Sequence, residues 1–286
     1  MKRAALAILA AALAPLAIPA SGQQTTQDAP AKRRVLITAF EPFDGREENN
    51  STRIANMMKA HPELFPGIEI TVCTLPVVYD EATASALACL DRMDEKPDLV
   101  LSLGEVGCKV QLETSAGNMD DVAGAPDNAG NVRSDRVIVP GAPARLGFSF
   151  PAQAMFCALS AEERKAVDVS NSMNYVCNNT AYLLGHKLRG TGIQHGFVHV
   201  PTTASYCGDA NDPLANARLI AHMIGGAFAD RETNREATYA LPHCTNEERL
   251  PTSLEELSRA ATSIAEAQDA VACEQEFLDR LKELMR

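Results

Sequence analysis

The sequence contains no tryptophan and few other aromatic residues, with nine phenylalanines and five tyrosines among 286 residues. None of its cysteines has the C-x-x-C spacing of structural zinc sites, so no metal is expected. No other cofactor is expected either. Lysine and arginine number 26 against 37 acidic residues, and the formal net charge is −11 without any basic stripe. This balance excludes an electrostatic nucleic-acid binder, so we expect no nucleic-acid partner.

Long apolar runs are also scarce. The one at the N-terminus, from Ala4 to Pro19, is about 16 residues long, whereas a membrane-spanning helix needs about 20. It follows the basic Met1-Lys2-Arg3 and precedes small residues, which is typical of a secretory signal peptide. We therefore predict a signal peptide over 1–22 and a flexible polar leader over 23–33. The mature protein is then periplasmic or secreted, without stable membrane association.

Beyond the leader, strand-like and helix-like segments alternate over residues 34–230. Apolar strands are predicted at Arg34–Phe40, Ile68–Leu75 and Leu99–Gly104, and the last lacks the alternation of a half-exposed strand. This order predicts an α/β fold, a single three-layer α/β/α domain with a mostly parallel mixed sheet. Residues 105–143 are rich in Gly, Asn, Asp and Pro, which predicts either a lid or short antiparallel strands.

Residues 231–286 form a predicted C-terminal extension, first irregular and then helical. A helix start is indicated at Ser253, with Glu256 placed to complete a capping box. A helical stripe of apolar residues follows, from Leu254 to Leu281. Packing against the chain's own domain is the favoured interpretation, and a lid or a homo-oligomer contact is the alternative.

The eight cysteines gain a second meaning if the chain is exported. If Cys177 stays reduced, seven remain, which allows up to three disulfides in an oxidising compartment. Spacing does not determine the pairing. Some of Cys207, Cys244 and Cys273 are expected to tether the C-terminal extension.

Cys177 and His199 lie in positions suited to nucleophilic catalysis. A short strand ends near Ser172, and a helix with its apolar side at Ala181, Leu184 and Leu188 follows, so Cys177 lies in or just before its first turn. A helix N-terminus is expected to lower the thiol pKa. The strand that ends at His199 returns to the same sheet edge, where the two side chains can meet. A buried structural cysteine and a core histidine are the alternative interpretation.

Five blocks resemble, in order, the pyroglutamyl peptidase I family, also called pyrrolidone carboxyl peptidases. The first is similar to the family's T-G-F-x-P-F-G-G, and the last two contain Cys177 and His199. The third block includes Glu113. The blocks are Val35–Gly45, Leu75–Tyr79, Pro97–Asn131, Tyr175–Asn178 and Gly196–Pro201.

The resemblance implies a cysteine peptidase that hydrolyses the amide bond after an N-terminal pyroglutamyl, or similar small, residue. It assigns Cys177 as the nucleophile, His199 as the general base and Glu113 as the acid, and the reaction passes through an acyl-enzyme. Asp120 and Asp121 are alternative acids. The implied partners are small N-terminally blocked peptides. Because members of the family are mostly cytosolic, this chain would be an exported variant.

The same resemblance places three aromatic side chains near the substrate ring, from Phe40, Phe43 and Tyr175. It also shows departures: Glu105 stands where the family has Gln, and an arginine close to the site is missing. Two alternative functions therefore stay open. One is an amide hydrolase of different N-terminal specificity, and the other is a catalytically inactive binding protein on the same fold.

Overall fold

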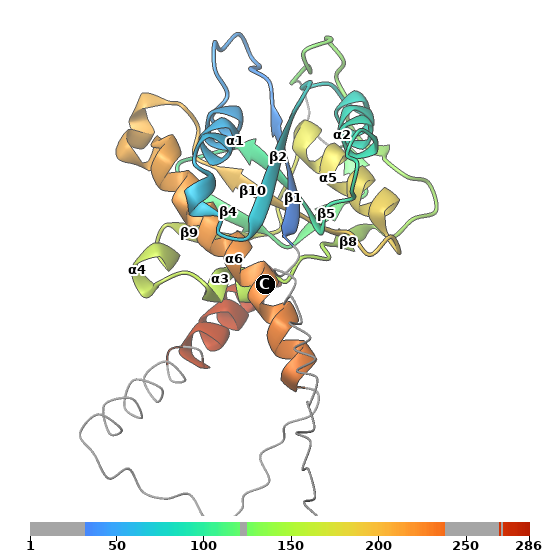
Figure 1. Cartoon of the computed structure of the whole chain (residues 1–286). Helices are drawn as coiled ribbons and strands as arrows, with labels where there is room; N and C mark the ends of the chain where they lie inside the picture. Colours follow the sequence, from blue (N-terminus) through green and yellow to red (C-terminus); the bar gives the residue numbers. More distant parts are fainter. Residues whose placement is uncertain (1–31, 121–124, 238–268, 270) are drawn as a thin grey trace, which may run out of the picture. The chain divides into compact units, whose positions relative to one another are not determined.

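The central element is a six-stranded sheet with the order β2-β1-β3-β10-β4-β9. The computed structural model describes residues 32–120, 125–237, 269 and 271–286 (Figure 1). Only the pairing of β4 with β10 is antiparallel, so the sheet is mixed and mostly parallel, as predicted. The strands are β1 Arg33–Phe40, β2 Ile68–Leu75, β3 Leu99–Glu105, β4 Val110–Glu113, β9 Val167–Ser170 and β10 Gln194–Val200.

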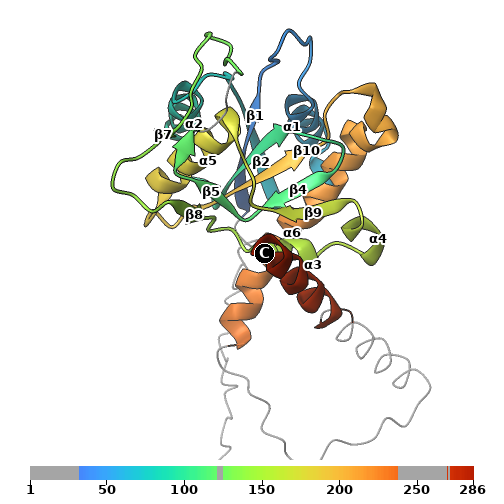
Figure 2. The ribbon, with the colours of Figure 1, turned by 180° about the vertical axis from the view of Figure 1, so that it is seen from behind.

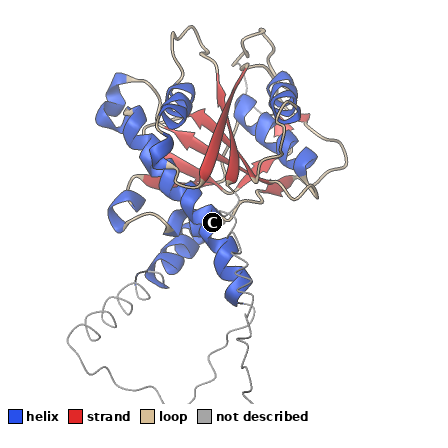
Figure 3. Cartoon of the chain, viewed as in Figure 1, coloured by secondary structure: helices blue, strands red, loops and turns tan. Residues whose placement is uncertain are grey.

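Helices cover both faces of this sheet (Figures 1 and 3). Helices α1 and α6, with the short α3, pack on the face that buries Val35 and Ile37 of β1. Helices α2 and α5 pack on the opposite face, over Leu36. Because both faces are buried, β1 is apolar at successive positions instead of alternating. The helices are α1 Asn50–Ala60, α2 Glu81–Asp91, α3 Ala152–Cys157, α4 Ala161–Arg164, α5 Tyr175–Leu188 and α6 Pro213–Ala237, with 3-10 turns η1 Pro62–Leu64 and η2 Ser205–Asn211.

The long connection after β3 contains short antiparallel strands, the second of the two predicted alternatives. Strand β5 pairs with β8, and β6 pairs with β7. These ribbons extend from the side of the sheet where α5 lies (Figure 2). Their bounds are β5 Ser115–Gly117, β6 Met119–Asp120, β7 Arg136–Val137 and β8 Arg145–Gly147.

Three predicted boundaries differ from the structure. Strand β3 ends at Glu105, one residue beyond the predicted Gly104. Strand β1 begins at Arg33, one residue inside the predicted leader. Helix α6 continues to Ala237, beyond the predicted start of the irregular segment at 231. No Gly or Pro interrupts the sequence between 227 and 241, so nothing local ends the helix at the predicted point. The predicted signal peptide and the helix start at Ser253 lie outside the described residues.

The described residues contain three disulfides. Cys73–Cys89 joins the consecutive elements β2 and α2, whereas Cys108–Cys207 and Cys157–Cys273 join segments that are 99 and 116 residues apart. Cys177 is the free cysteine of the part that the structure describes, so three disulfides plus one thiol are confirmed there. Cys207 pairs inside the domain rather than with the extension, because η2 lies beside the loop that carries Cys108. Cys244 lies outside the described residues.

The C-terminal helix, residues 271–284, packs against the chain's own domain. The Cys157–Cys273 disulfide ties it to α3, and the rings of Phe156 and Phe277 lie 5.6 Å apart. Arg164 is buried and donates to Glu276 over 3.1 Å, which adds a charged contact to the same interface. No helix of the described ranges is both long and apolar enough to cross a membrane.

Candidate active site

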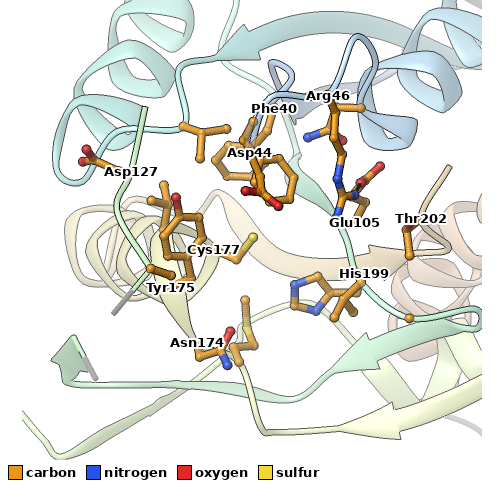
Figure 4. Close-up of a pocket in the computed structure, with 18 of the residues that line it drawn as sticks. Phe40, Asp44, Arg46, Glu105, Asp127, Asn174, Tyr175, Cys177, His199 and Thr202 are labelled. Atoms are coloured by element: carbon orange, nitrogen blue, oxygen red, sulfur yellow. Dashed lines mark hydrogen bonds and ion pairs between the residues drawn. The ribbon is translucent and has the colours of Figure 1, made fainter. Parts of the chain in front are cut away.

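A cavity of about 950 Å³ opens at the carboxyl ends of β1, β3 and β10, beside the first turn of α5 (Figure 4). Parallel strands deliver their carboxyl ends to one edge of a sheet, where open α/β folds place their sites. The register pairs Phe40 with Leu75 and His199 with Gly104, so these strand ends coincide. Every residue that the sequence assigned to the site lines this cavity: Phe40, Phe43, Glu105, Glu113, Tyr175, Cys177 and His199.

Cys177 is the third residue of α5, and its sulfur lies directly over β3. A Cβ atom placed on Gly104 would lie 2.8 Å from the Cys177 Sγ and equally close to the ring of Phe197. Real Cβ atoms do not approach other atoms so closely, so glycine at this position gives the sulfur its room.

The thiol pKa is shifted in the direction opposite to the prediction. Burial, followed by the negative charges of Glu113 and Glu105, raises the pKa of the Cys177 thiol to about 12. These effects outweigh the helix N-terminus, which would favour the thiolate. The resting thiol is therefore protonated at neutral pH, and attack on a substrate requires a base to take its proton.

His199 and Glu113 form a buried pair beside the thiol. The Nδ1 atom of His199 lies 2.8 Å from the Glu113 Oε1, and both side chains are more than 90% buried. Strand β4 brings them together, because it runs antiparallel to β10 and ends at Glu113. Figure 4 shows the His199 ring and the Cys177 sulfur turned toward one another. The imidazole thus has a carboxylate on one nitrogen and the cavity on its other side.

The alternative acids do not share this arrangement. Asp120 accepts hydrogen bonds from Arg133 over 3.1 Å and from Asn179 over 3.1 Å, and it does not line the cavity. Asp121 lies outside the described residues. Of the two candidates that the structure describes, Glu113 is the one that lies against His199.

His195 and His199 have an H-x-x-x-H spacing, but they lie on one strand. Four residues of an extended strand span about 13 Å, so the two rings do not meet at one metal ion. Among the described residues, no group of three metal-ligating side chains is found.

Aromatic rings form one wall of the cavity. Tyr175 packs against Phe43 with ring centroids 6.3 Å apart, and against Tyr79 at 5.6 Å. The hydroxyl of Tyr175 donates a 2.7 Å hydrogen bond to the carbonyl of Pro126. Tyr175 also has φ +55, a left-handed conformation that costs a non-glycine residue of order 1–3 kcal/mol. These contacts hold the ring of Tyr175 in place, and Tyr175 precedes Cys177 by two residues.

Glu105 and Arg46 form an ion pair inside the cavity, and Arg46 was not predicted. The other oxygen of Glu105 accepts a 2.6 Å hydrogen bond from the Asn50 backbone N–H at the start of α1. The Arg46 guanidinium lies 4.9 Å from the centre of the Phe43 ring. Glu105 lines the cavity, as predicted for a substrate-binding residue, but both its oxygens are bound by the protein and hold the β1–α1 loop. The sequence offered one indication of the role of Arg46, because it is the only cation of the loop between β1 and α1.

A free cysteine beside a histidine–carboxylate pair, at the carboxyl edge of an α/β/α sheet, is the arrangement of a cysteine peptidase. A family model described as pyroglutamyl peptidase matches residues 33–220. A pyrrolidone-carboxylate peptidase of Streptomyces coelicolor is 37% identical over 201 residues, which are 68% of this chain and 90% of that protein. One of Erwinia tasmaniensis is 35% identical over 194 residues, covering 67% and 88%.

Solved structures agree with this similarity. Pyroglutamyl peptidase I of Bacillus amyloliquefaciens shares the fold with a TM-score of 0.59 at 24% identity, covering 68% of this chain and 98% of that one. A mutant pyrrolidone carboxyl peptidase of Pyrococcus furiosus has a TM-score of 0.59 at 26% identity, covering 69% and 99%. The chain therefore belongs to the pyroglutamyl peptidase family, whose members are cysteine-type peptidases that remove N-terminal pyroglutamate.

Proposed function

We propose that this chain is an exported cysteine peptidase that hydrolyses the amide bond after an N-terminal pyroglutamyl residue, with Cys177, His199 and Glu113 as its catalytic residues. The observation that carries the proposal is the 2.8 Å contact between His199 and Glu113 in the cavity that also contains the Cys177 thiol. Its substrates are small peptides blocked at the N-terminus.

The proposed reaction begins with a proton transfer. Because the resting thiol is protonated, His199 takes the proton from Cys177 as the sulfur attacks the carbonyl carbon of the substrate. The carbonyl electron pair moves to oxygen, and the first backbone N–H groups of α5, which have no partner within the helix, stabilise that oxyanion. Glu113 accepts the Nδ1 proton of His199 in a hydrogen bond and stabilises the imidazolium.

Collapse of the tetrahedral intermediate breaks the carbon–nitrogen bond. His199 gives its proton to the leaving amine, and the pyroglutamyl group stays on Cys177 as a thioester. Water, deprotonated by His199, then attacks the thioester carbon. The products are free pyroglutamate and the regenerated thiol, so no oxidant, reductant or metal takes part.

The aromatic wall supports recognition of a pyroglutamyl ring. This ring is a small neutral lactam, and a slot of aromatic side chains with a few polar partners is suited to it. Phe43 and Tyr175 provide such faces next to Cys177, and the Glu105–Arg46 pair fixes the loop that carries Phe43.

The substrate test is a comparison of arylamides. We expect the reduced-thiol form of the mature protein, with its disulfides intact, to cleave pyroglutamyl arylamide at least about 100-fold faster than prolyl or alanyl arylamide. Such a ratio is reachable because a site built around a lactam N–H and carbonyl penalises substrates that lack them. Faster cleavage of another arylamide would favour the different N-terminal specificity, and cleavage of none would favour the inactive binding protein.

Export is supported by two independent features. The N-terminal 22 residues have the pattern of a signal peptide, and three disulfides are typical of oxidising compartments. Expression of the full chain in a bacterium should therefore give a protein that begins near Gln23 and fractionates with the periplasm or medium. N-terminal sequencing and fractionation check this, and an intact chain retained in the cytosol would contradict export.

A further inference from the structure

The leaving part of the substrate must pass His199. General acid catalysis requires the amine nitrogen to lie within hydrogen-bond reach of the imidazole. Figure 4 shows His199 on one side of the Cys177 sulfur and Tyr175 on the other, with Thr202 beyond His199. With the pyroglutamyl ring on the aromatic wall, a leaving peptide near His199 would lie on the side of Thr202.

Two large apolar side chains are exposed on the rim of the same cavity. Tyr206, in η2, is 78% exposed, and Val106, just after β3, is 39% exposed. Single exposed apolar residues are common. Here two of them, from different loops, line one catalytic cavity. Among the described residues, Tyr206 has no side-chain hydrogen bond or ring partner, so its face is free for a ligand.

These two loops are fixed to each other. The Cys108–Cys207 disulfide joins them one residue after Tyr206 and two residues after Val106. The Thr202 N–H donates to the Gly107 carbonyl over 2.9 Å, and the Val106 N–H donates to Val200 over 2.9 Å. A rim held in place before binding loses less conformational entropy on binding, which increases affinity.

We infer that Val106 and Tyr206 form the subsite for the side chain of the residue that follows the pyroglutamyl group, and that this subsite prefers an aromatic or large aliphatic side chain. The inference rests on the proposed function. Arg46 and Glu105, the charged groups next to this rim, are paired with one another, so neither is free to select a charged residue. Asp44 is exposed on the same cavity, and its carboxylate could instead select a basic side chain.

The test compares dipeptide amides that differ only in the second residue: pyroglutamyl-Phe, pyroglutamyl-Gly and pyroglutamyl-Lys. We expect kcat/KM for the Phe substrate to exceed that for the Gly substrate by about tenfold, the upper range of an aromatic contact. Tyr206→Ala should reduce this ratio to about two or less, while cleavage of the Gly substrate stays within about twofold of the wild-type value. Tyr206→Phe should keep the preference.

Two further variants sharpen the test. Val132→Ala truncates an exposed valine that does not line the cavity. It should leave kcat/KM unchanged for both the Phe and the Gly substrate. The double variant Cys108→Ser with Cys207→Ser frees Tyr206 and should lower the Phe preference while the Gly substrate is still cleaved. If this double variant does not fold, the three single variants still decide.

Each outcome has one meaning. Equal cleavage of the Phe and Gly substrates by the wild type, or a Phe preference that survives in Tyr206→Ala, would overturn the subsite and leave the peptidase intact. Fastest cleavage of the Lys substrate would also overturn it and would assign selection to Asp44. No cleavage of any of the three would refute the proposed function, and the subsite with it.

Discussion

Cys177→Ala is expected to lower kcat/KM for a pyroglutamyl arylamide by roughly 10⁴- to 10⁶-fold, the range found when a catalytic nucleophile is removed. The sulfur is the group placed to attack, and no other free thiol occurs among the described residues. The fold should persist, because Cys177 is in no disulfide and alanine fits an early turn of α5. Steady-state kinetics measure the loss, and circular dichroism with a thermal melt verifies the fold.

A matched control separates the nucleophile from cysteine loss in general. Replacing both Cys73 and Cys89 by alanine removes a disulfide between β2 and α2. Neither of these cysteines lines the cavity. That variant should melt at a lower temperature but retain activity within a few-fold below its melting point. Activity of Cys177→Ala within tenfold of the wild-type value would show that another residue is the nucleophile.

Glu113→Gln is expected to lower kcat by about 10³- to 10⁴-fold with little change in KM. A neutral amide no longer stabilises the imidazolium of His199, and its NH₂ group can hold the ring in the wrong tautomer. The side chain is buried and similar in shape to glutamate, so the cavity keeps its form. Steady-state kinetics on the folded variant separate kcat from KM.

A second readout of the same variant is the thiol pKa. Because the Glu113 charge raises the pKa of the Cys177 thiol, its removal should move the pH dependence of iodoacetamide labelling to lower pH. Burial and Glu105 still act, so the thiol pKa should remain above its usual range. An unchanged labelling profile together with unchanged kcat would show that Glu113 does not act on this site.

Asp120→Asn is the control for the choice of acid. Asp120 accepts hydrogen bonds from both Arg133 and Asn179, and the NH₂ group of an asparagine would face one of these donors, so stability should fall. It does not line the cavity, so kcat should stay within about tenfold of the wild-type value at temperatures where the variant is folded. A large loss of kcat in Asp120→Asn but not in Glu113→Gln would transfer the acid role to Asp120.

Much of the site could be predicted because local patterns determine it. Helix α5 runs back along β10, with Cys177 near the level of His199 and Gly185 near His195, so the start of the helix and the end of the strand lie at the same sheet edge. The expected parallel strand–helix–strand unit is not formed, because β9 runs antiparallel to β10 with β4 between them. Phe40 is the last residue of β1 and Phe43 follows in the next loop, and both line the cavity. The apolar run before them had already predicted where this strand ends. The predictions that hold therefore concern short stretches.

The rest depends on contacts between distant segments. The sign of the Cys177 pKa shift follows from burial and from carboxylates on β3 and β4, whereas the sequence showed only the local helix terminus. Arg46 could be placed in the cavity only once Glu105 was known to face it across the sheet edge. The pairing of Cys108 with Cys207 depends in the same way on where η2 lies, and cysteine spacing contains no information about that.

The Cys157–Cys273 disulfide attaches the C-terminal helix covalently to α3, independently of the chain that leads from α6 to that helix. If a protease cut any peptide bond between residues 238 and 268, the polypeptide would become two chains that remain covalently attached. Phe277 and Arg164 would keep their contacts with Phe156 and Glu276. Such a molecule migrates as one species on a gel without reductant and as two with it.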